Sequence, residues 1–122
     1  MNFLSKNLTV FLKEIRLKNN NERLSDMAMK LGVSASYLST VETAKRRMND
    51  KLFKKIIEVY QLNTQEQREL NELRNLASNE VSFSFEDLDV SKKEAVVKFL
   101  SNVDDLSSED LEKINLLLKS KK

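Results

Sequence analysis

The chain has 122 residues, of which one is Gly and none is Pro, Cys or His. Tight turns normally recruit Gly and Pro, so a sandwich or barrel of many short strands is excluded in favour of a helix-rich protein. Without Cys or His, disulfides, the usual soft-ligand metal sites and serine–histidine or cysteine–histidine catalysis are excluded as well.

The net charge of +2 conceals an asymmetry along the chain. Residues 1–62 hold 12 Lys/Arg and 6 Asp/Glu, whereas residues 63–122 hold 9 and 13. This pattern indicates that only the first half meets a polyanion, and ordinary variation in surface charge is the alternative. No apolar run approaches the ~20 residues that cross a bilayer, and charges break up any signal-peptide core. We therefore expect a cytoplasmic protein with no membrane partner.

Apolar residues recur at helical spacing from Leu8 to Ile15 and again from Leu24 to Leu31, which predicts two amphipathic helices. The asparagine-rich segment between them is typical of a loop. Gly32 follows the second helix, at a position where the left-handed backbone conformation is common and costs glycine nothing. The sequence therefore predicts a sharp turn at Gly32.

A third helix is predicted over residues 35–43, with Leu38 and Val41 on its buried side. Ser34 precedes it and suits the N-cap, because its hydroxyl can accept from backbone N–H groups one turn later. Val33 can pack in the angle between the second and third helices. A helix, a turn of three to four residues and another helix make a helix-turn-helix unit.

Two further helices complete the first domain, which we expect to span residues 1–78. Asn49 or Asp50 can cap the fourth helix, which carries an apolar face. Thr64 is expected to cap the fifth helix, with Gln67 at the third helical position of a capping box.

Residues 79–122 form a C-terminal extension of different character. Val81, Phe83 and Phe85 alternate with polar residues, so this segment is a short strand or an extended arm. We expect a helix to open at Ser91, and a last helix to be capped by one of the two serines that precede it. The predicted fold class is all-α, with five helices, a short extended segment and two C-terminal helices.

The third helix presents small side chains away from its buried side, at Ala35, Ser36, Ser39 and Thr40. A helix of this kind can sink into the DNA major groove, where hydroxyl groups reach base edges and an alanine methyl can touch a thymine methyl. The alternative is that this face is simply solvated. The basic residues 45–47 follow immediately and are well placed for phosphates, and Arg23 can extend the same basic rim. Tyr37 either stacks against a sugar–phosphate strand or packs partly into the domain, and we favour packing.

The stretch RLSDMAMKLGVSASYLSTVETAKRR, residues 23–47, resembles the phage-repressor-like Xre family of helix-turn-helix regulators. The pattern shared with the family is Leu-Gly-Val-Ser, then Ser-Tyr-Leu-Ser, a hydrophobic residue, Glu and a basic loop. The resemblance extends through the fifth helix to residue 78. Residues 79–122 resemble, more loosely, a subgroup with a short C-terminal helical extension.

The resemblance implies a five-helix, lambda-repressor-like DNA-binding domain whose members usually bind inverted repeats as dimers and act as repressors. Base contacts are expected at Ser34, Ala35, Ser36, Ser39 and Thr40, although the resemblance itself places Ser34 and Ser39 near bases or phosphates. Phosphate contacts are expected at Arg23, Tyr37, Lys45, Arg46 and Arg47, of which the resemblance itself implies Lys45 and Arg46. For Glu42 the resemblance implies a structural role inside the domain.

Three positions depart from the family pattern. Leu24 stands where many members carry a Gln that touches a phosphate, so that contact is in doubt. Thr43 and Ala44 replace the Asn-Gly that commonly ends the third helix, and Met48 stands where Pro is frequent. The turn after the third helix must therefore form without glycine.

The C-terminal extension offers more apolar surface than two helices can bury alone. The candidate dimer-interface residues are Phe83, Phe85, Leu111, Ile114, Leu117 and Leu118. A symmetric pairing of two chains would cover them, and it would supply the second recognition helix that a palindrome requires. The alternative is that this surface packs onto the fifth helix of its own chain.

There are three functional hypotheses. The first is a sequence-specific DNA-binding transcriptional regulator, acting as a repressor of its own operon or of a neighbouring mobile-element gene. The alternative is an antitoxin that neutralises a toxin through its acidic C-terminal half and also autoregulates. An enzyme is disfavoured, because the sequence offers no recognisable nucleophile, metal site or phosphate-binding loop. We expect double-stranded DNA and a second copy of the chain as partners, and no cofactor or metal.

Overall fold

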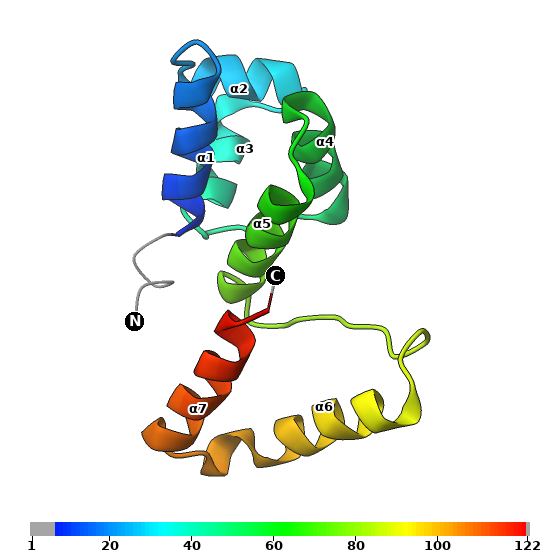
Figure 1. Cartoon of the computed structure of the whole chain (residues 1–122). Helices are drawn as coiled ribbons and strands as arrows, with labels where there is room; N and C mark the ends of the chain where they lie inside the picture. Colours follow the sequence, from blue (N-terminus) through cyan, green and yellow to red (C-terminus); the bar gives the residue numbers. More distant parts are fainter. Residues whose placement is uncertain (1–6, 122) are drawn as a thin grey trace. The chain divides into compact units, whose positions relative to one another are not determined.

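The computed structural model describes residues 7–121, and residues 1–6 and 122 lie outside the described part. The chain divides into two compact units, Met1–Val81 and Ser82–Lys122 (Figure 1). All regular structure in residues 7–121 is helical, so the predicted all-α class is confirmed. No helix in this range is long and apolar enough to cross a membrane.

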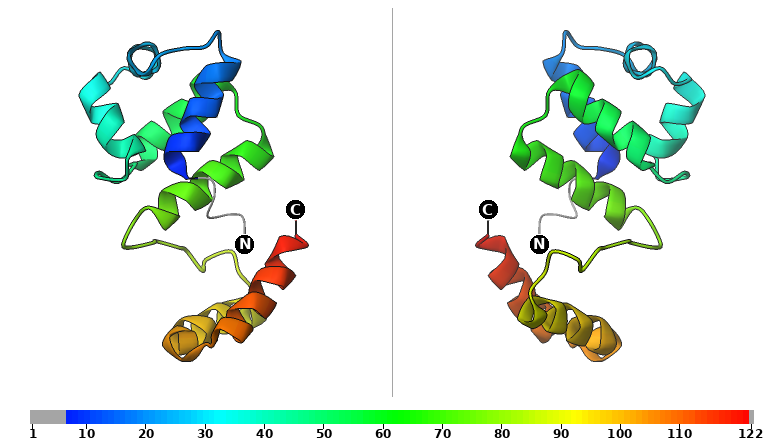
Figure 2. Two further views of the ribbon diagram at one scale, coloured as in Figure 1. Left: turned by 90° about the vertical axis from the view of Figure 1, so that its left-hand side faces the viewer. Right: turned by 90° about the vertical axis from the view of Figure 1, so that its right-hand side faces the viewer.

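The first unit holds five helices in the predicted order. They are α1 (Leu8–Lys18), α2 (Leu24–Leu31), α3 (Ala35–Glu42), α4 (Asp50–Tyr60) and α5 (Thr64–Leu76). Helix α2 packs against both α3 and α4, and α1 packs against both α3 and α5 (Figure 2). The five helices therefore close around one interior.

The interior of the first unit is apolar and draws on every helix. Its buried members are Leu8, Phe11, Leu12, Ile15, Met27, Ala28, Leu31, Leu38, Val41, Met48, Leu52, Ile56, Leu62, Leu70 and Leu73. At roughly 25 cal/mol for each Å² of apolar surface removed from water, this burial is the main force that holds the unit together. Met48 is buried in the loop before α4, where the family often has Pro, so it anchors that loop by packing.

The N-termini of α1, α3, α4 and α5 are capped by polar side chains, but the predicted cap of α5 is wrong. Helix α5 is capped by Asn63, whose side chain accepts from the Glu66 N–H while the Glu66 carboxylate accepts from the Asn63 N–H. Thr64 is the first helical residue and Gln67 lies one position beyond the capping box. The cap needs an extended backbone, and Asn63 has it, with φ −74° and ψ 173°.

The second unit contains α6 (Val90–Asn102), the short 3-10 turn η2 (Val103–Asp105) and α7 (Ser108–Lys119). Helix α6 begins earlier than predicted, because Asp89 caps it rather than Ser91 opening it. The N–H of Lys92 donates to the Asp89 carboxylate at 2.9 Å, and this bond holds the pKa of Asp89 below its usual range. Ser107 caps α7 through a capping box with Asp110.

Residues 79–85, which include the boundary of the two units, form an extended arm and not a strand. The rings of Phe83 and Phe85 meet edge to face with centroids 5.7 Å apart. Among residues 82–121 no side chain is buried, and Phe83, Leu116 and Leu117 are each more than half exposed. The second unit therefore has amphipathic helices but no core of its own.

Candidate nucleic-acid interface

The turn between α2 and α3 is built as the sequence predicts. Gly32 adopts the left-handed conformation with φ 73°, and its N–H donates to the Met29 carbonyl at 3.2 Å. The N–H of Val33 donates to the Ala28 carbonyl at 3.0 Å, which completes a Schellman motif. Ser34 then caps α3, because its Oγ accepts from the Tyr37 N–H at 3.0 Å. These local bonds fix the direction in which α3 leaves α2.

Helix α3 has two sharply different faces. Leu38 and Val41 are fully buried in the interior of the first unit. Ala35 and Ser36 are exposed, whereas Ser39 and Thr40 are half-buried. The five predicted base-contact residues, Ser34, Ala35, Ser36, Ser39 and Thr40, therefore all keep accessible surface on one short element. Their contact with bases stays a prediction.

The C-terminal end of α3 is fixed by a buried ion pair that sequence reasoning did not predict. Arg16 on α1 donates to both carboxylate oxygens of Glu42 at 2.7 and 3.2 Å, and each side chain is only 7% exposed. Arg16 also contacts the sulfur of Met27 at 3.4 Å. Glu42 therefore acts inside the domain, as the family resemblance implies. The one signal for Arg16 in the sequence was its place beside Ile15 at the edge of the apolar stripe.

The basic loop, residues 43–49, follows α3 and turns without glycine. Ala44 takes the left-handed conformation with φ 63°, and the Ala44 N–H donates to the Val41 carbonyl at 3.1 Å. The N–H groups of Lys45 and Arg46 both donate to the Thr40 carbonyl, at 2.9 and 3.1 Å. This second Schellman motif sends the loop back over the end of α3. The side chains of residues 45–47 are all exposed.

Tyr37 has features of both roles predicted for it. It is half-buried against the interior of the first unit, and its ring also faces the Arg46 guanidinium at 5.5 Å from the centroid. The Asn49 amide makes a long contact to the Tyr37 hydroxyl at 3.5 Å. Packing and a place beside the basic loop are therefore both features of this side chain.

The far end of the loop is held by Arg74 on α5. Its guanidinium donates to the Met48 carbonyl at 3.3 Å and to the Asp50 carboxylate at 3.0 Å, and it stacks over the Phe53 ring at 4.1 Å. Arg74 is largely covered in this position. It is therefore a structural cation, unlike the exposed cations of the basic loop.

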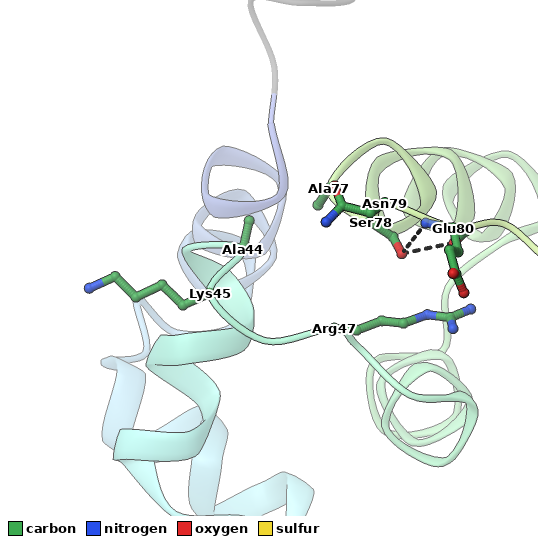
Figure 3. Close-up of a pocket in the computed structure, with 7 residues that line it drawn as sticks. All are labelled: Ala44, Lys45, Arg47, Ala77, Ser78, Asn79 and Glu80. Carbon is green, nitrogen blue, oxygen red and sulfur yellow. Dashed lines mark hydrogen bonds between the residues drawn. The ribbon is translucent and has the colours of Figure 1, made fainter.

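A polar surface pocket of about 410 Å³ lies between the basic loop and the end of α5 (Figure 3). Its lining residues are Ala44, Lys45, Arg47, Ala77, Ser78, Asn79 and Glu80. Figure 3 shows that Lys45 extends away from the pocket, whereas Arg47 extends along it toward Glu80. Arg47 is therefore a loop cation that faces a carboxylate of its own unit.

Arg23, which precedes α2, and Lys30 on α2 are both engaged with acidic neighbours. Arg23 is exposed, and its side chain meets the Asp26 carboxylate at 3.4 Å, while its backbone N–H donates to the same carboxylate and lowers the pKa of Asp26. Lys30 pairs with the buried Glu22 carboxylate and lies over the Tyr60 ring. The exposed cations nearest to α3 along the chain are therefore residues 45–47.

Within residues 7–121 no three acidic side chains gather into a group that could hold a metal ion. The exposed side of α3 and the basic loop instead offer hydroxyl groups, methyl groups and positive charge. Hydroxyl and methyl groups can contact base edges, and exposed cations can contact phosphates. Fold and surface together define a helix-turn-helix DNA-binding domain.

Residues 12–67 match the family model described as helix-turn-helix. This part of the chain belongs to the Xre, or lambda-repressor-like, helix-turn-helix family, as the sequence resemblance implied. No curated protein and no solved structure matches the chain. The match begins within α1 and ends early in α5, so the second unit lies outside it. The protein is a DNA-binding transcriptional regulator.

Proposed function

We propose that the protein is a repressor that binds an inverted-repeat operator as a homodimer, with α3 of each copy in the major groove. The observation that carries this proposal is the division of α3 into a buried apolar side and an open side of small residues, followed directly by exposed cations. Each copy would read one half-site. Two recognition helices about 34 Å apart fit successive turns of one face of the duplex.

The contacts within each half-site divide by chemistry. Ser34, Ala35, Ser36, Ser39 and Thr40 would contact base edges. Arg23, Tyr37, Lys45, Arg46 and Arg47 would contact phosphates. Of the latter, Lys45 and Arg46 are supported best, because neither forms an ion pair with another described residue and the N–H groups of both are bonded to the Thr40 carbonyl at the end of α3. Phosphate contacts supply affinity that depends on salt, and base contacts supply sequence preference.

The second unit would pair the two copies. In support, residues 82–121 bury no side chain, while both helices carry apolar residues more than a third exposed. The predicted interface residues Phe83, Leu111, Leu117 and Leu118 are exposed, and Phe85 and Ile114 are partly covered. Two-fold pairing would bury these faces against one another. The expected division of labour is DNA binding by residues 1–78 and dimerisation by residues 79–122.

The DNA-binding part of the proposal is tested by the salt dependence of affinity. A duplex selected from a random pool is titrated at several salt concentrations with the wild type and with Arg46→Ala. Loss of one phosphate contact should reduce the log–log salt slope by about one. Arg68→Ala, which removes an exposed cation of α5 far along the chain from α3, is the matched control and should leave the slope unchanged. An equal slope for Arg46→Ala and the wild type would contradict a phosphate contact at Arg46.

An antitoxin that autoregulates is the second candidate. It is favoured by the same uncovered apolar faces of α6 and α7, which a foreign protein could cover instead of a second copy. The residues from 63 onward are also net acidic, which suits a basic partner. Two results together would contradict this candidate. The chain would form a stable homodimer in sedimentation equilibrium, and the apolar faces of α6 and α7 in that dimer would be protected from hydrogen exchange and from covalent labelling. A small toxin gene beside the gene for this chain would favour it.

A further inference from the structure

The hydroxyl groups of Thr40 in α3 and of Thr43, the C-cap residue, are both bonded to the backbone of the helix. Thr40 Oγ1 donates to the Tyr37 carbonyl at 2.7 Å, and Thr43 Oγ1 donates to the Ser39 carbonyl at 2.8 Å. A hydroxyl has one proton, so each of these groups has already used its only donor. What remains available from each threonine is an acceptor lone pair and the Cγ2 methyl group.

The outer side of α3 also lacks the side chains that make the strongest base contacts. Guanine is usually read by Arg or Lys, and adenine by Asn or Gln, each through two parallel hydrogen bonds. Between Ala35 and Thr43 there is no Arg, Lys, Asn or Gln, and the one charged residue, Glu42, is buried in its ion pair with Arg16. Specificity therefore has to come from smaller groups.

Thr43 belongs with these groups although it lies at the end of the helix. Residues 36, 40 and 43 follow helical spacing of four and three, so they share one side of α3. Ser36 and Thr43 are exposed, and Thr40 is half-buried. Together with the Ala35 side chain, the two threonine methyl groups make this side of the helix more apolar than its hydroxyl-bearing residues suggest.

We infer that α3 recognises thymine C5-methyl groups through the methyl groups of Thr40 and Thr43, and thus selects A·T pairs, with Thr43 a specificity-determining residue. This inference rests on the proposed function, because it requires α3 to lie in the major groove. In that groove the methyl group distinguishes A·T from G·C pairs, which carry none. The threonine hydroxyl groups fix the rotamers by bonding to the helix, so the methyl groups are held in place before DNA arrives.

The test uses substitutions that separate the methyl group from the hydroxyl group. Thr43→Val keeps the methyl group and replaces the hydroxyl with a second methyl, whereas Thr43→Ser keeps the hydroxyl and loses the methyl. Thr43 is exposed, so neither change creates a cavity in the interior. The duplex is the one that the wild type selects from a random pool, together with versions in which each thymine in turn is replaced by deoxyuridine, which removes only the methyl group.

The wild type should select a half-site rich in A·T pairs, and one thymine-to-deoxyuridine change should weaken its binding roughly fourfold, the value of about one buried methyl-sized group. Thr43→Val should stay as sensitive to deoxyuridine as the wild type, because its β-branched side chain keeps the methyl group in the same restricted χ1 rotamer without the hydroxyl bond. Thr43→Ser should lose roughly the same fourfold on the thymine duplex and be insensitive to deoxyuridine at that position. Thr40→Val and Thr40→Ser should repeat the pattern at a neighbouring thymine.

The opposite pattern overturns the inference. If Thr43→Val weakens binding while Thr43→Ser does not, the hydroxyl group reads the DNA. If no thymine is sensitive to loss of its methyl group, or the selected half-site is G·C-rich under α3, the inference also fails while DNA binding stands. If the wild type selects no duplex even at low salt, the proposed function fails, and the inference fails with it.

Discussion

Arg16 on α1 and Glu42, the last residue of α3, form a two-point ion pair across 26 positions of sequence. The Glu42 carbonyl also accepts from the Thr9 hydroxyl at 2.7 Å. Two contacts therefore fix the end of α3 to α1. The basic loop begins one residue later, so the same contacts determine where its cations start.

Replacing Arg16 by Met is expected to lower the free energy of unfolding by about 3–5 kcal/mol, because it leaves the Glu42 carboxylate buried without its cation. Urea denaturation followed by circular dichroism measures this loss. Combining Arg16→Met with Glu42→Leu should restore much of the stability, since an apolar pair carries no desolvation cost. A loss below about 1 kcal/mol for Arg16→Met alone, the size typical of surface pairs, would contradict a buried role.

The ion pair shows what the sequence could not supply. The resemblance predicts that Glu42 acts inside the domain, but the residues around Arg16 do not predict an ion pair with a residue far along the chain. A single Arg beside the apolar stripe of an amphipathic helix normally extends into water. Only the packing of α1 against α3 turns it inward. Long-range polar pairs of this kind depend on tertiary structure and leave little trace in local sequence patterns.

Replacing Gly32 by Ala and replacing Ala44 by Gly are expected to change the stability of the fold in opposite directions. Both occupy the left-handed region, with φ 73° and 63°. Gly32→Ala should cost about 1–2 kcal/mol of stability through backbone strain alone, because no atom lies within 4 Å of the added Cβ. Ala44→Gly should gain about 0.5–1 kcal/mol, because relief of strain exceeds the added entropy of the unfolded chain. Thermal unfolding of the two variants beside the wild type measures both changes, and shifts of the same sign would contradict this explanation.

Tyr60 should make the first unit sensitive to alkali. Its hydroxyl donates to the Glu22 carboxylate at 2.8 Å, and burial together with this bond raises the pKa of Tyr60 above its ordinary value of 10.0. The folded state then holds the phenolic proton more tightly than the unfolded state does. The resulting stabilisation is complete below pH 10 and is lost progressively as the pH rises further.

The measurement uses the fact that the chain has two tyrosines. In Tyr37→Phe only Tyr60 contributes tyrosinate absorbance, which should appear well above pH 10 and together with loss of helix. Tyr60→Phe should lose less stability than the wild type between neutral pH and strong alkali. Ionisation of Tyr60 at its ordinary pKa in a folded protein would contradict the prediction.

The helix-turn-helix could be predicted closely because its signals are local. Gly32 and Ser34 determine the turn through their own backbone and cap, without help from distant residues. The cap of α5 was misplaced because Asn63 and Thr64 are both good capping residues, and composition does not choose between neighbours. The spacing of apolar residues in α6 and α7 predicts their open apolar faces. The same spacing does not identify the molecule that covers these faces, because that depends on a binding partner.

Dimerisation by the second unit predicts that Leu117→Lys, at a side chain 62% exposed, weakens self-association and leaves folding intact. A charge in a paired apolar face is costly, whereas a charge on a surface that meets water is tolerated. Leu17→Lys is the matched control, because Leu17 on α1 is 66% exposed and lies in the other unit. Sedimentation equilibrium should show Leu117→Lys shifted toward monomer and Leu17→Lys unchanged.

On DNA, Leu117→Lys should lose affinity for a duplex with two half-sites and keep the wild-type affinity for a single half-site, since only the first requires pairing. Equal losses for both lysine variants, or none for either, would place the pairing surface elsewhere.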